Sequence, residues 1–210
     1  MNRFISLEGG EGVGKSTQLS LLVSWLRKRA VRVTETFEPG ATPAGARIKD
    51  TLLRQDIGEL APLTELLLFA ADRNEHVRQV VRPSLDKGDV VVSSRFTDST
   101  IAYQSAAGGV PLSTVRAVCD LATNETQPGL VIVLDVKPEV ALARIAVDVA
   151  GGRDRIEANA LDFHREVRNS FLSMASNEPD RYAVVDADRP VNVVADEVAA
   201  VVARYLRLEH

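Results

Sequence analysis

The stretch SLEGGEGVGKSTQ, from Ser6 to Gln18, decides the fold of this chain. It contains four glycines, follows the apolar run FISL of residues 4–7, and matches the pattern G-x-x-x-x-G-K-[ST]. Glycines let successive backbone N–H groups turn inward, and the N-terminus of a following helix adds partial positive charge. A glycine-rich turn without function is the alternative, but a strand before the loop and a helix after it favour a site for the phosphates of a nucleoside triphosphate.

The side chains of the loop indicate how a triphosphate would be held. Lys15 is expected to bridge the β- and γ-phosphates, and the Ser16 hydroxyl is placed to bind Mg²⁺. Kinases, GTPase switches and motor ATPases share such a loop, so it does not identify the acceptor. The predicted ATP-binding residues are Gly9, Gly10, Glu11, Gly12, Val13, Gly14, Lys15, Ser16 and Thr17.

Composition and charge exclude several classes of protein. A chain of 210 residues, 45% of them hydrophobic, can bury one core, and we expect a single domain over residues 1–207. The net charge of -4 argues against a nucleic-acid partner, because counterion release needs clustered Lys and Arg. Cys119 is the only cysteine, which excludes an internal disulfide and fits a reducing cytoplasm.

The sequence also argues against a membrane partner. No apolar stretch approaches the ~20 residues that span a bilayer, and the N-terminus lacks the basic and apolar segments of a secretory leader. We therefore expect a cytoplasmic protein. Residues 208–210, Leu-Glu-His, resemble the start of an expression tag and are left out of the fold prediction.

Short β-branched runs alternate with helical patterns along the chain, which predicts strands and helices in turn. Because the runs are apolar throughout, helices should cover both faces of a central parallel sheet of about five strands, in a three-layer α/β P-loop fold. The predicted strands are 4–7, 31–36, 90–93, 130–136 and 183–186, and the predicted helices are 15–29, 62–86 with an interruption at Pro83, 138–148 and 161–176.

A glycine-containing segment interrupts this alternation. Residues 149–155, VAGGRDR, place two glycines beside Arg153 and Arg155, between two predicted helices. Such a segment is typical of a mobile loop that carries charge to a site. We predict a small flap at about residues 148–156.

Six ordered stretches together resemble one family: FISLEGGEGVGKSTQ, EPGATPAG, TELLLFAADRNEHV, SSRFTDSTIAYQ, DRIEANALDFHREVR and DRYAVVDA. With them the chain resembles the bacterial thymidylate kinases (dTMP kinases), which belong to the P-loop nucleoside monophosphate kinases, over nearly its whole length. The resemblance implies a homodimeric, Mg²⁺-dependent transferase that phosphorylates dTMP to dTDP with ATP, in the synthesis of dTTP. Two alternatives stay open: a kinase for another nucleoside monophosphate, and a weakly active or regulatory nucleotide-binding protein.

The resemblance also implies the residues of the acceptor site. On helical spacing alone, Phe69 would be a core residue and Arg73 a surface residue. The resemblance implies otherwise: the aromatic residue at the matching family position stacks on the thymine base, and the arginine hydrogen-bonds the base or the nearby phosphate. Arg95 is expected to clamp the acceptor phosphate, and Tyr103 to crowd the 2′ position so that deoxyribose is preferred. The implied substrate-binding residues are Glu38, Pro39, Phe69, Arg73, Arg95, Thr100, Tyr103 and Gln104.

The flap is expected to supply the catalytic arginine. Some subtypes of the family carry this arginine in the phosphate loop, where this chain has Gly12, so the resemblance assigns the role to Arg153, with Arg155 as its competitor. A planar guanidinium suits the charge that spreads over the transferring phosphoryl group. The implied catalytic residues are Lys15, Arg95 and Arg153.

The chain departs from the family at three positions near the site. Ser94 stands where an aspartate usually precedes the arginine of the family motif. Phe37 replaces an arginine before the Glu-Pro-Gly turn, and Gly108 replaces another arginine after the Ala-Tyr-Gln segment. These changes leave the triphosphate loop intact but reduce the charge around the acceptor and the metal.

The loss of an aspartate at Ser94 concerns the magnesium site. A serine hydroxyl adds no negative charge next to a dication, so the charge must come from elsewhere. Glu11 is the nearest candidate in the sequence and Glu8 the second, and the predicted metal residues are Ser16 and Glu11. Two histidines without Cys or carboxylate at metal-ligand spacing are interpreted as surface residues without a role: His76 and His164.

Overall fold

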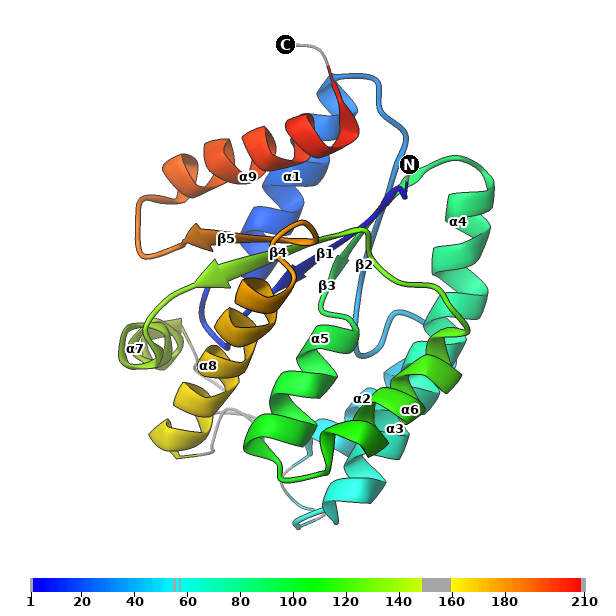
Figure 1. Cartoon of the computed structure of the whole chain (residues 1–210), viewed down its shortest axis with the longest axis vertical. Coiled ribbons are helices and arrows are strands. Elements are labelled where there is room, and N and C mark those ends of the chain that lie inside the picture. The colour runs from blue at the N-terminus through cyan, green and yellow to red at the C-terminus, as the bar shows by residue number, and fades with distance from the viewer. Residues whose placement is uncertain (1, 55, 57, 149–159, 209–210) are drawn as a thin grey trace.

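The computed structural model describes residues 2–54, 56, 58–148 and 160–208. A five-stranded sheet lies at the centre, and its strand pairs are all parallel. Helices lie on both faces of the sheet (Figure 1), so the predicted three-layer α/β fold is confirmed. The strand order is β2-β3-β1-β4-β5, with β1 at Phe4–Glu8, β2 at Val33–Phe37, β3 at Val90–Ser94, β4 at Leu130–Asp135 and β5 at Tyr182–Asp186.

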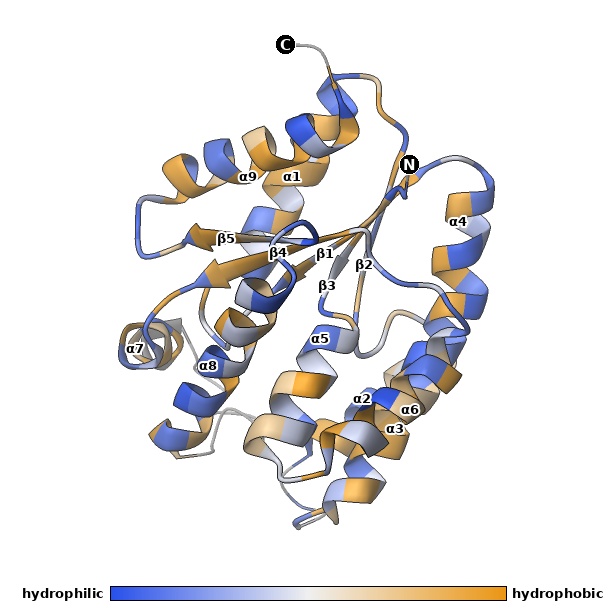
Figure 2. Ribbon diagram, in the orientation of Figure 1, coloured by the Kyte–Doolittle hydropathy of each residue, from blue (hydrophilic) through white to orange (hydrophobic). Residues whose placement is uncertain are grey.

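One face of the sheet is covered by α1 (Lys15–Lys28) and α9 (Val191–Leu206), which pack against each other above the strands in Figure 1. Alternate residues of each strand point to this face, as the period of two in a strand requires. Together with the apolar stripes of the two helices, visible in Figure 2, they form a large core cluster. Its strand members include Ile5, Leu7, Val90, Val92, Ile132 and Leu134.

The opposite face carries α4 (Arg82–Asp86), the π-helical segments η1 (Val77–Val81) and η2 (Ile101–Ala107), and α8 (Leu161–Asn177). The other alternate strand residues pack on this face. Phe4 and Val91 belong to one core cluster with Phe96, and Val131 and Val133 belong to another with Phe171. Further out, α2 (Pro43–Leu53) and α6 (Leu112–Thr123) pack on α3 (Pro62–His76), and the short α5 (Thr97–Thr100) leads into η2.

The helix predicted for residues 62–86 is present, but Pro83 does not interrupt it. The elements α3, η1 and α4 follow one another without a gap from Pro62 to Asp86. Proline lacks a backbone N–H and normally breaks the α-helical ladder. The π-helical turn of η1 shifts that ladder by one residue just before Pro83, which accommodates the proline.

The other predicted elements are confirmed, with ends that differ by one or two residues from those observed. The prediction omits the helices α2, α5, α6 and α9 and the π-helical segment η2.

The predicted flap lies between α7 (Pro138–Asp148) and α8. Residues 149–159, including Arg153 and Arg155, lie outside the described residues, so the flap stays a prediction. Of the expected tag remnant, Leu208 is described: its N–H donates to the Ala203 carbonyl at 3.0 Å, and its side chain packs against the core. No helix within the described ranges is long and apolar enough to cross a bilayer.

Candidate active site

The glycine loop lies where β1 ends and α1 begins. Ligands of open parallel sheets bind at this carboxyl edge of the strands. Gly9, Gly12 and Gly14 have φ angles of 135°, 69° and 92°. Residues with a β-carbon rarely adopt such values, so the shape of the loop depends on these glycines.

Gly12 is also constrained by a neighbouring helix. A β-carbon added there would lie 2.1 Å from the carbonyl oxygen of Ala141 on α7. No side chain fits this position unless α7 moves. An arginine inside the loop is therefore sterically excluded at Gly12 in this structure.

Lys15 is enclosed by the loop that precedes it and is only 9% exposed. Its Nζ donates to the Gly9 carbonyl at 2.9 Å and to the Gly10 carbonyl. Burial and the Arg95 guanidinium lower the pKa of Lys15 to about 7, against the opposing effect of nearby carboxylates. Phosphate oxygens in the loop would favour the charged form and raise this pKa again.

Glu11 connects the loop to η2, to α8 and to the residue that follows β3. Its carboxylate accepts from Arg95 Nη2 at 2.8 Å and from the Tyr103 hydroxyl at 2.6 Å, and lies 3.4 Å from Nδ1 of His164. Burial alone would raise the pKa of Glu11, but Arg95, His164 and Lys15 outweigh it and hold that pKa far below its usual range. Glu11 is thus a charged side chain that fixes the Arg95 guanidinium beside the loop.

Arg95 reaches the loop through an unusual backbone conformation. Its φ of 70° lies in the left-handed region that non-glycine residues seldom adopt. The Arg95 N–H donates to the Leu7 carbonyl at 2.9 Å, and Nη1 donates to Ser99 Oγ at 3.1 Å. The guanidinium lies 5.0 Å from the centroid of the Tyr103 ring. Backbone strain of this kind is concentrated at functional sites.

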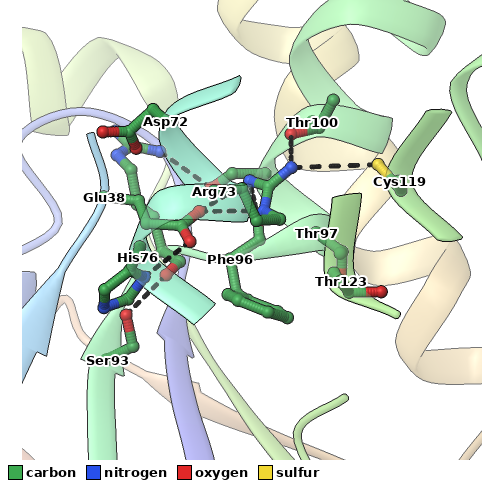
Figure 3. A network of polar contacts seen from close by, with 12 residues as sticks. Glu38, Asp72, Arg73, His76, Ser93, Phe96, Thr97, Thr100, Cys119 and Thr123 are labelled. Carbon is green, nitrogen blue, oxygen red and sulfur yellow. Dashed lines mark hydrogen bonds and ion pairs between the residues drawn. The ribbon is translucent and has the colours of Figure 1, made fainter. Parts of the chain in front are cut away.

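Arg73 is the centre of a buried network of polar contacts (Figure 3) and is 2% exposed. Nε and Nη2 donate to Glu38 at 2.9 and 2.7 Å, and Nη2 also donates to the Phe96 carbonyl at 3.0 Å. Nη1 donates to Thr100 Oγ1 at 2.8 Å and makes a weaker contact of 3.8 Å with Cys119 Sγ. Arg73 is therefore not the surface residue that helical spacing alone predicts.

A cavity of about 1110 Å³ brings the predicted residues together. Gly9 and Gly10 are not part of its lining, although their carbonyls hold Lys15, and Arg153 lies outside the described residues. The predicted site residues that line the cavity are Glu11, Gly12, Val13, Gly14, Lys15, Ser16, Thr17, Glu38, Pro39, Phe69, Arg73, Arg95, Thr100, Tyr103 and Gln104.

The interpretation of His76 and His164 as surface residues is wrong, since they are 0% and 5% exposed. His76 contacts Glu38, and His164 contacts Glu11. For His76 the sequence contains a signal, because it follows Arg73 by three residues and so shares its helical face. For His164 it contains none, because α8 and the loop meet only in the folded chain.

The three departures from the family lie in or next to the cavity. Phe37 is 45% exposed, lines the cavity, and has the Lys49 ammonium 5.6 Å from its ring centroid. Ser94 lines the cavity at the end of β3. At Gly108 an added β-carbon would lie 2.6 Å from the Tyr103 carbonyl, so an arginine would displace the end of η2.

Residues that the sequence analysis did not identify form the far end of the cavity, beyond α1. Arg144 on α7 donates to the Ala187 carbonyl at 3.2 Å and pairs with Asp188 at 2.7 Å. One sequence signal for this end of the cavity was available. Ala187 directly follows the predicted strand 183–186, and ligands bind at the edge where parallel strands end. The lining residues of this end are Arg144, Ile145, Ala187, Arg189, Pro190, Val191 and Val194.

Asp72 attaches α3 to the turn that follows Glu38. Its Oδ1 accepts from the Gly40 N–H at 2.9 Å, and its buried Oδ2 has no partner among the described residues. Burial, with Glu38 nearby, raises the pKa of Asp72 to about 6. Protonation of Asp72 therefore favours the folded state.

Replacing Asp72 by asparagine should remove this pH dependence. The pKa of Asp72 is about 6 in the folded protein and about 4 in the unfolded chain. In the wild type, the stabilisation that protonation of Asp72 provides is therefore present below pH 4 and is lost as the pH rises through 6. Asparagine can still accept from the Gly40 N–H, and it does not titrate. The free energy of unfolding of Asp72→Asn minus that of the wild type should therefore increase from pH 4 to pH 7. Urea unfolding measures it, with the exposed Asp162→Asn as control. A pH-independent difference would contradict the prediction.

A glycine loop between a parallel strand and a helix, a buried loop lysine and arginines facing it across one cavity define a P-loop phosphotransferase. Comparison with known proteins narrows this class. The family model for thymidylate kinases matches residues 7–198. The chain belongs to the thymidylate kinase family.

Individual relatives agree with this assignment. The thymidylate kinase of Clavibacter sepedonicus is 45% identical over 94% of this chain and 92% of its own length. That of a Synechococcus strain is 48% identical over 91% of this chain and 90% of its own length. The crystal structure of thymidylate kinase from Ehrlichia chaffeensis superposes with a TM-score of 0.77 at 31% identity, and covers 95% of this chain and 97% of that one.

Proposed function

We propose that this chain transfers the γ-phosphoryl group of ATP to dTMP, giving ADP and dTDP. The observation that carries the proposal is the cavity of about 1110 Å³, whose lining includes both the phosphate loop and the residues expected to bind the acceptor. A pocket for one small ligand is usually ~300–1,000 Å³. The cavity is large enough for a donor and an acceptor in contact.

On the donor side, the loop and Lys15 hold the phosphates. The nucleoside of ATP would extend toward Arg144 and Pro190, which line the same cavity beyond α1. Gly12 leaves no room for an arginine in the loop, and this supports the assignment of the catalytic arginine to Arg153. Phosphoryl transfer depends mainly on positioning and on charge stabilisation, so no nucleophilic side chain is required.

On the acceptor side, Arg95 would bind the phosphate of dTMP, and Phe69 would stack on the base. Glu11 and Tyr103 hold Arg95 next to the loop, where the two phosphates must meet. The Arg73 N–H that contacts Cys119 Sγ at 3.8 Å has the weakest partner of its donors. Arg73 lines the cavity together with Thr100, the partner of its Nη1, and would hydrogen-bond the base from there.

An acceptor panel tests the proposal. ADP formation from ATP is measured with dTMP, dUMP, GMP and CMP, and we expect it to depend on the acceptor, with the highest kcat/KM for dTMP. Preference for another monophosphate would identify a different nucleotide kinase. Tight ATP binding without turnover on any acceptor would indicate a regulatory protein instead.

We propose Mg²⁺ as the cation that accompanies ATP. The described residues contain no group of three His, Cys, Asp or Glu side chains that could hold a metal ion. This fits Mg²⁺, which is usually bound by phosphate oxygens and water with few protein ligands. Ser16 lines the cavity and would give its hydroxyl to the ion. Glu11, whose oxygens contact Arg95 and Tyr103, would act through its charge.

The magnesium requirement should respond to Glu11 and Ser94. Ser94→Asp adds a carboxylate where β3 ends at the cavity, so it should lower the Mg²⁺ concentration that gives half-maximal rate. Glu11→Gln removes a charge and should raise that concentration, whereas the matched variant Ser94→Ala should change it little. Initial rates over a magnesium titration measure all three. An unchanged titration for Glu11→Gln would mean that Glu11 only orients Arg95.

We also propose that the chain is a cytoplasmic homodimer. Leu63 and Leu67 lie one turn apart on α3 and are 51% and 52% exposed, and Leu121 on α6, which packs on α3, is 81% exposed. Exposed leucines on adjoining helices support association through this surface. The buried, unpaired Cys119 is consistent with a reducing compartment.

A further inference from the structure

Three side chains of α3 hold the turn that follows β2. Asp72 accepts from the Gly40 N–H at 2.9 Å, Arg73 pairs with Glu38 at 2.7 Å, and His76 contacts the other oxygen of Glu38 at 2.7 Å. Figure 3 shows the His76 ring pointing at the Glu38 carboxylate from the side opposite Arg73. Glu38 is thus held between two side chains of one helix.

The hydrogen bonds of His76 fix the direction of this contact. An ionised carboxylate only accepts, so Nδ1 of His76 donates to Glu38 Oε1. On the other side of the ring, Nε2 lies 2.6 Å from the hydroxyl of Thr36 on β2. His76 is 0% exposed and Thr36 is 4% exposed, so both bonds are shielded from water. The ring has a single well-defined orientation.

Glu38 in turn determines the orientation of Arg73. Burial alone would raise the pKa of Glu38, but Arg73 and His76 outweigh it and hold that pKa below its usual range. The Arg73 guanidinium receives two of its contacts from Glu38, and Nη1 is thereby directed to Thr100. Glu38, Arg73 and Thr100 all line the cavity, whereas His76 does not.

We propose that His76 is a positioning residue for the acceptor site. It holds the Glu38 carboxylate in the orientation that keeps the Arg73 guanidinium at the cavity wall beside Thr100, and it does so from outside the cavity. This inference rests on the proposed role of Glu38 and Arg73 in binding dTMP. A histidine with only a structural role would stabilise the fold without affecting one substrate more than the other.

The first test replaces His76 by phenylalanine, which keeps an aromatic ring and removes both hydrogen bonds. The loss of one hydrogen bond to a charged group should raise KM for dTMP about tenfold, while KM for ATP stays within a factor of about two. Val202→Ala on α9, buried in the core of the opposite face, is the control for destabilisation. Melting temperatures of both variants show that the kinetic comparison is made on folded protein.

A double-mutant cycle tests whether His76 acts through Glu38. In a Glu38→Gln background, His76→Phe should raise KM for dTMP by less than about twofold, because the carboxylate that it positions is gone. Thr36→Val removes only the outer hydrogen bond and should give a smaller increase than His76→Phe. Equal increases in both KM values, or a full effect of His76→Phe in the Glu38→Gln background, would overturn the proposal.

Arg73→Lys separates failure of this inference from failure of the proposed site. Lysine cannot reproduce the fork that contacts Glu38 and Thr100, so KM for dTMP should rise. If Arg73→Lys raises it and His76→Phe does not, the site stands and the positioning role of His76 is refuted. If neither variant raises it, the proposed acceptor site itself is wrong.

Discussion

Replacing Lys15 by alanine should lower kcat at least about a hundredfold, because electrostatic stabilisation of a transferring group is commonly worth that much for one removed donor. In the structure, Lys15 Nζ is held by the Gly9 and Gly10 carbonyls at the centre of the loop. It is the buried cation of the loop, at the place where the β- and γ-phosphates are expected. Without it, the negative charge on the donor would be offset only by Mg²⁺, the loop N–H groups and the arginines of the cavity.

The Lys15→Ala measurement needs a test of folding, because Lys15 is only 9% exposed. Its buried contacts are with loop carbonyls rather than with the core, so the melting temperature should change little. Lys28→Ala, at the exposed end of the same helix, is the control and should retain full activity. A folded Lys15→Ala variant that keeps more than about a tenth of the wild-type rate would contradict a role in bridging the phosphates.

Replacing Arg153 by alanine should also lower kcat about a hundredfold or more, because an arginine that stabilises phosphoryl-transfer charge is worth ~10³–10⁵ in kcat in other P-loop enzymes. Two observations support this assignment. Gly12 has no room for an arginine in the loop, and the last turns of α7, where Arg144 and Ile145 line the cavity, lead into the segment that carries Arg153.

A residue that acts only on charge developing in the transition state should lower kcat without weakening ATP binding. KM for ATP should therefore stay within a factor of about two in Arg153→Ala. Arg155→Ala is the matched control, and a larger share of its effect should fall on KM. Steady-state kinetics with ATP varied at saturating dTMP separate the two. Equally small losses in both variants would show that the flap is only a lid.

The fold class and the phosphate loop could be predicted from the residues of the chain alone. Short-range sequence patterns predict these features. Apolar runs indicate buried parallel strands, and the spacing of glycines before Lys15 indicates the phosphate loop. The assignment of Phe69, Arg95 and Tyr103 came from resemblance rather than from spacing, and the structure places them around one cavity. Their roles toward dTMP remain predictions.

The burial of the polar groups and the partners that they contact follow from the packing of the folded chain. Glu38 and His76 are 38 residues apart, and Glu11 and His164 are 153 residues apart. No local pattern encodes such pairs, because they depend on how α3 meets the turn after β2 and on how α8 meets the phosphate loop. The same packing places Ala141 against Gly12 and so excludes an arginine from the loop. Burial of a polar group is tolerated when its hydrogen bonds are satisfied within the fold, and both ring nitrogens of His76 have such partners in Glu38 and Thr36. His164 contacts Glu11 through Nδ1, whereas its Nε2 has no partner among the described residues.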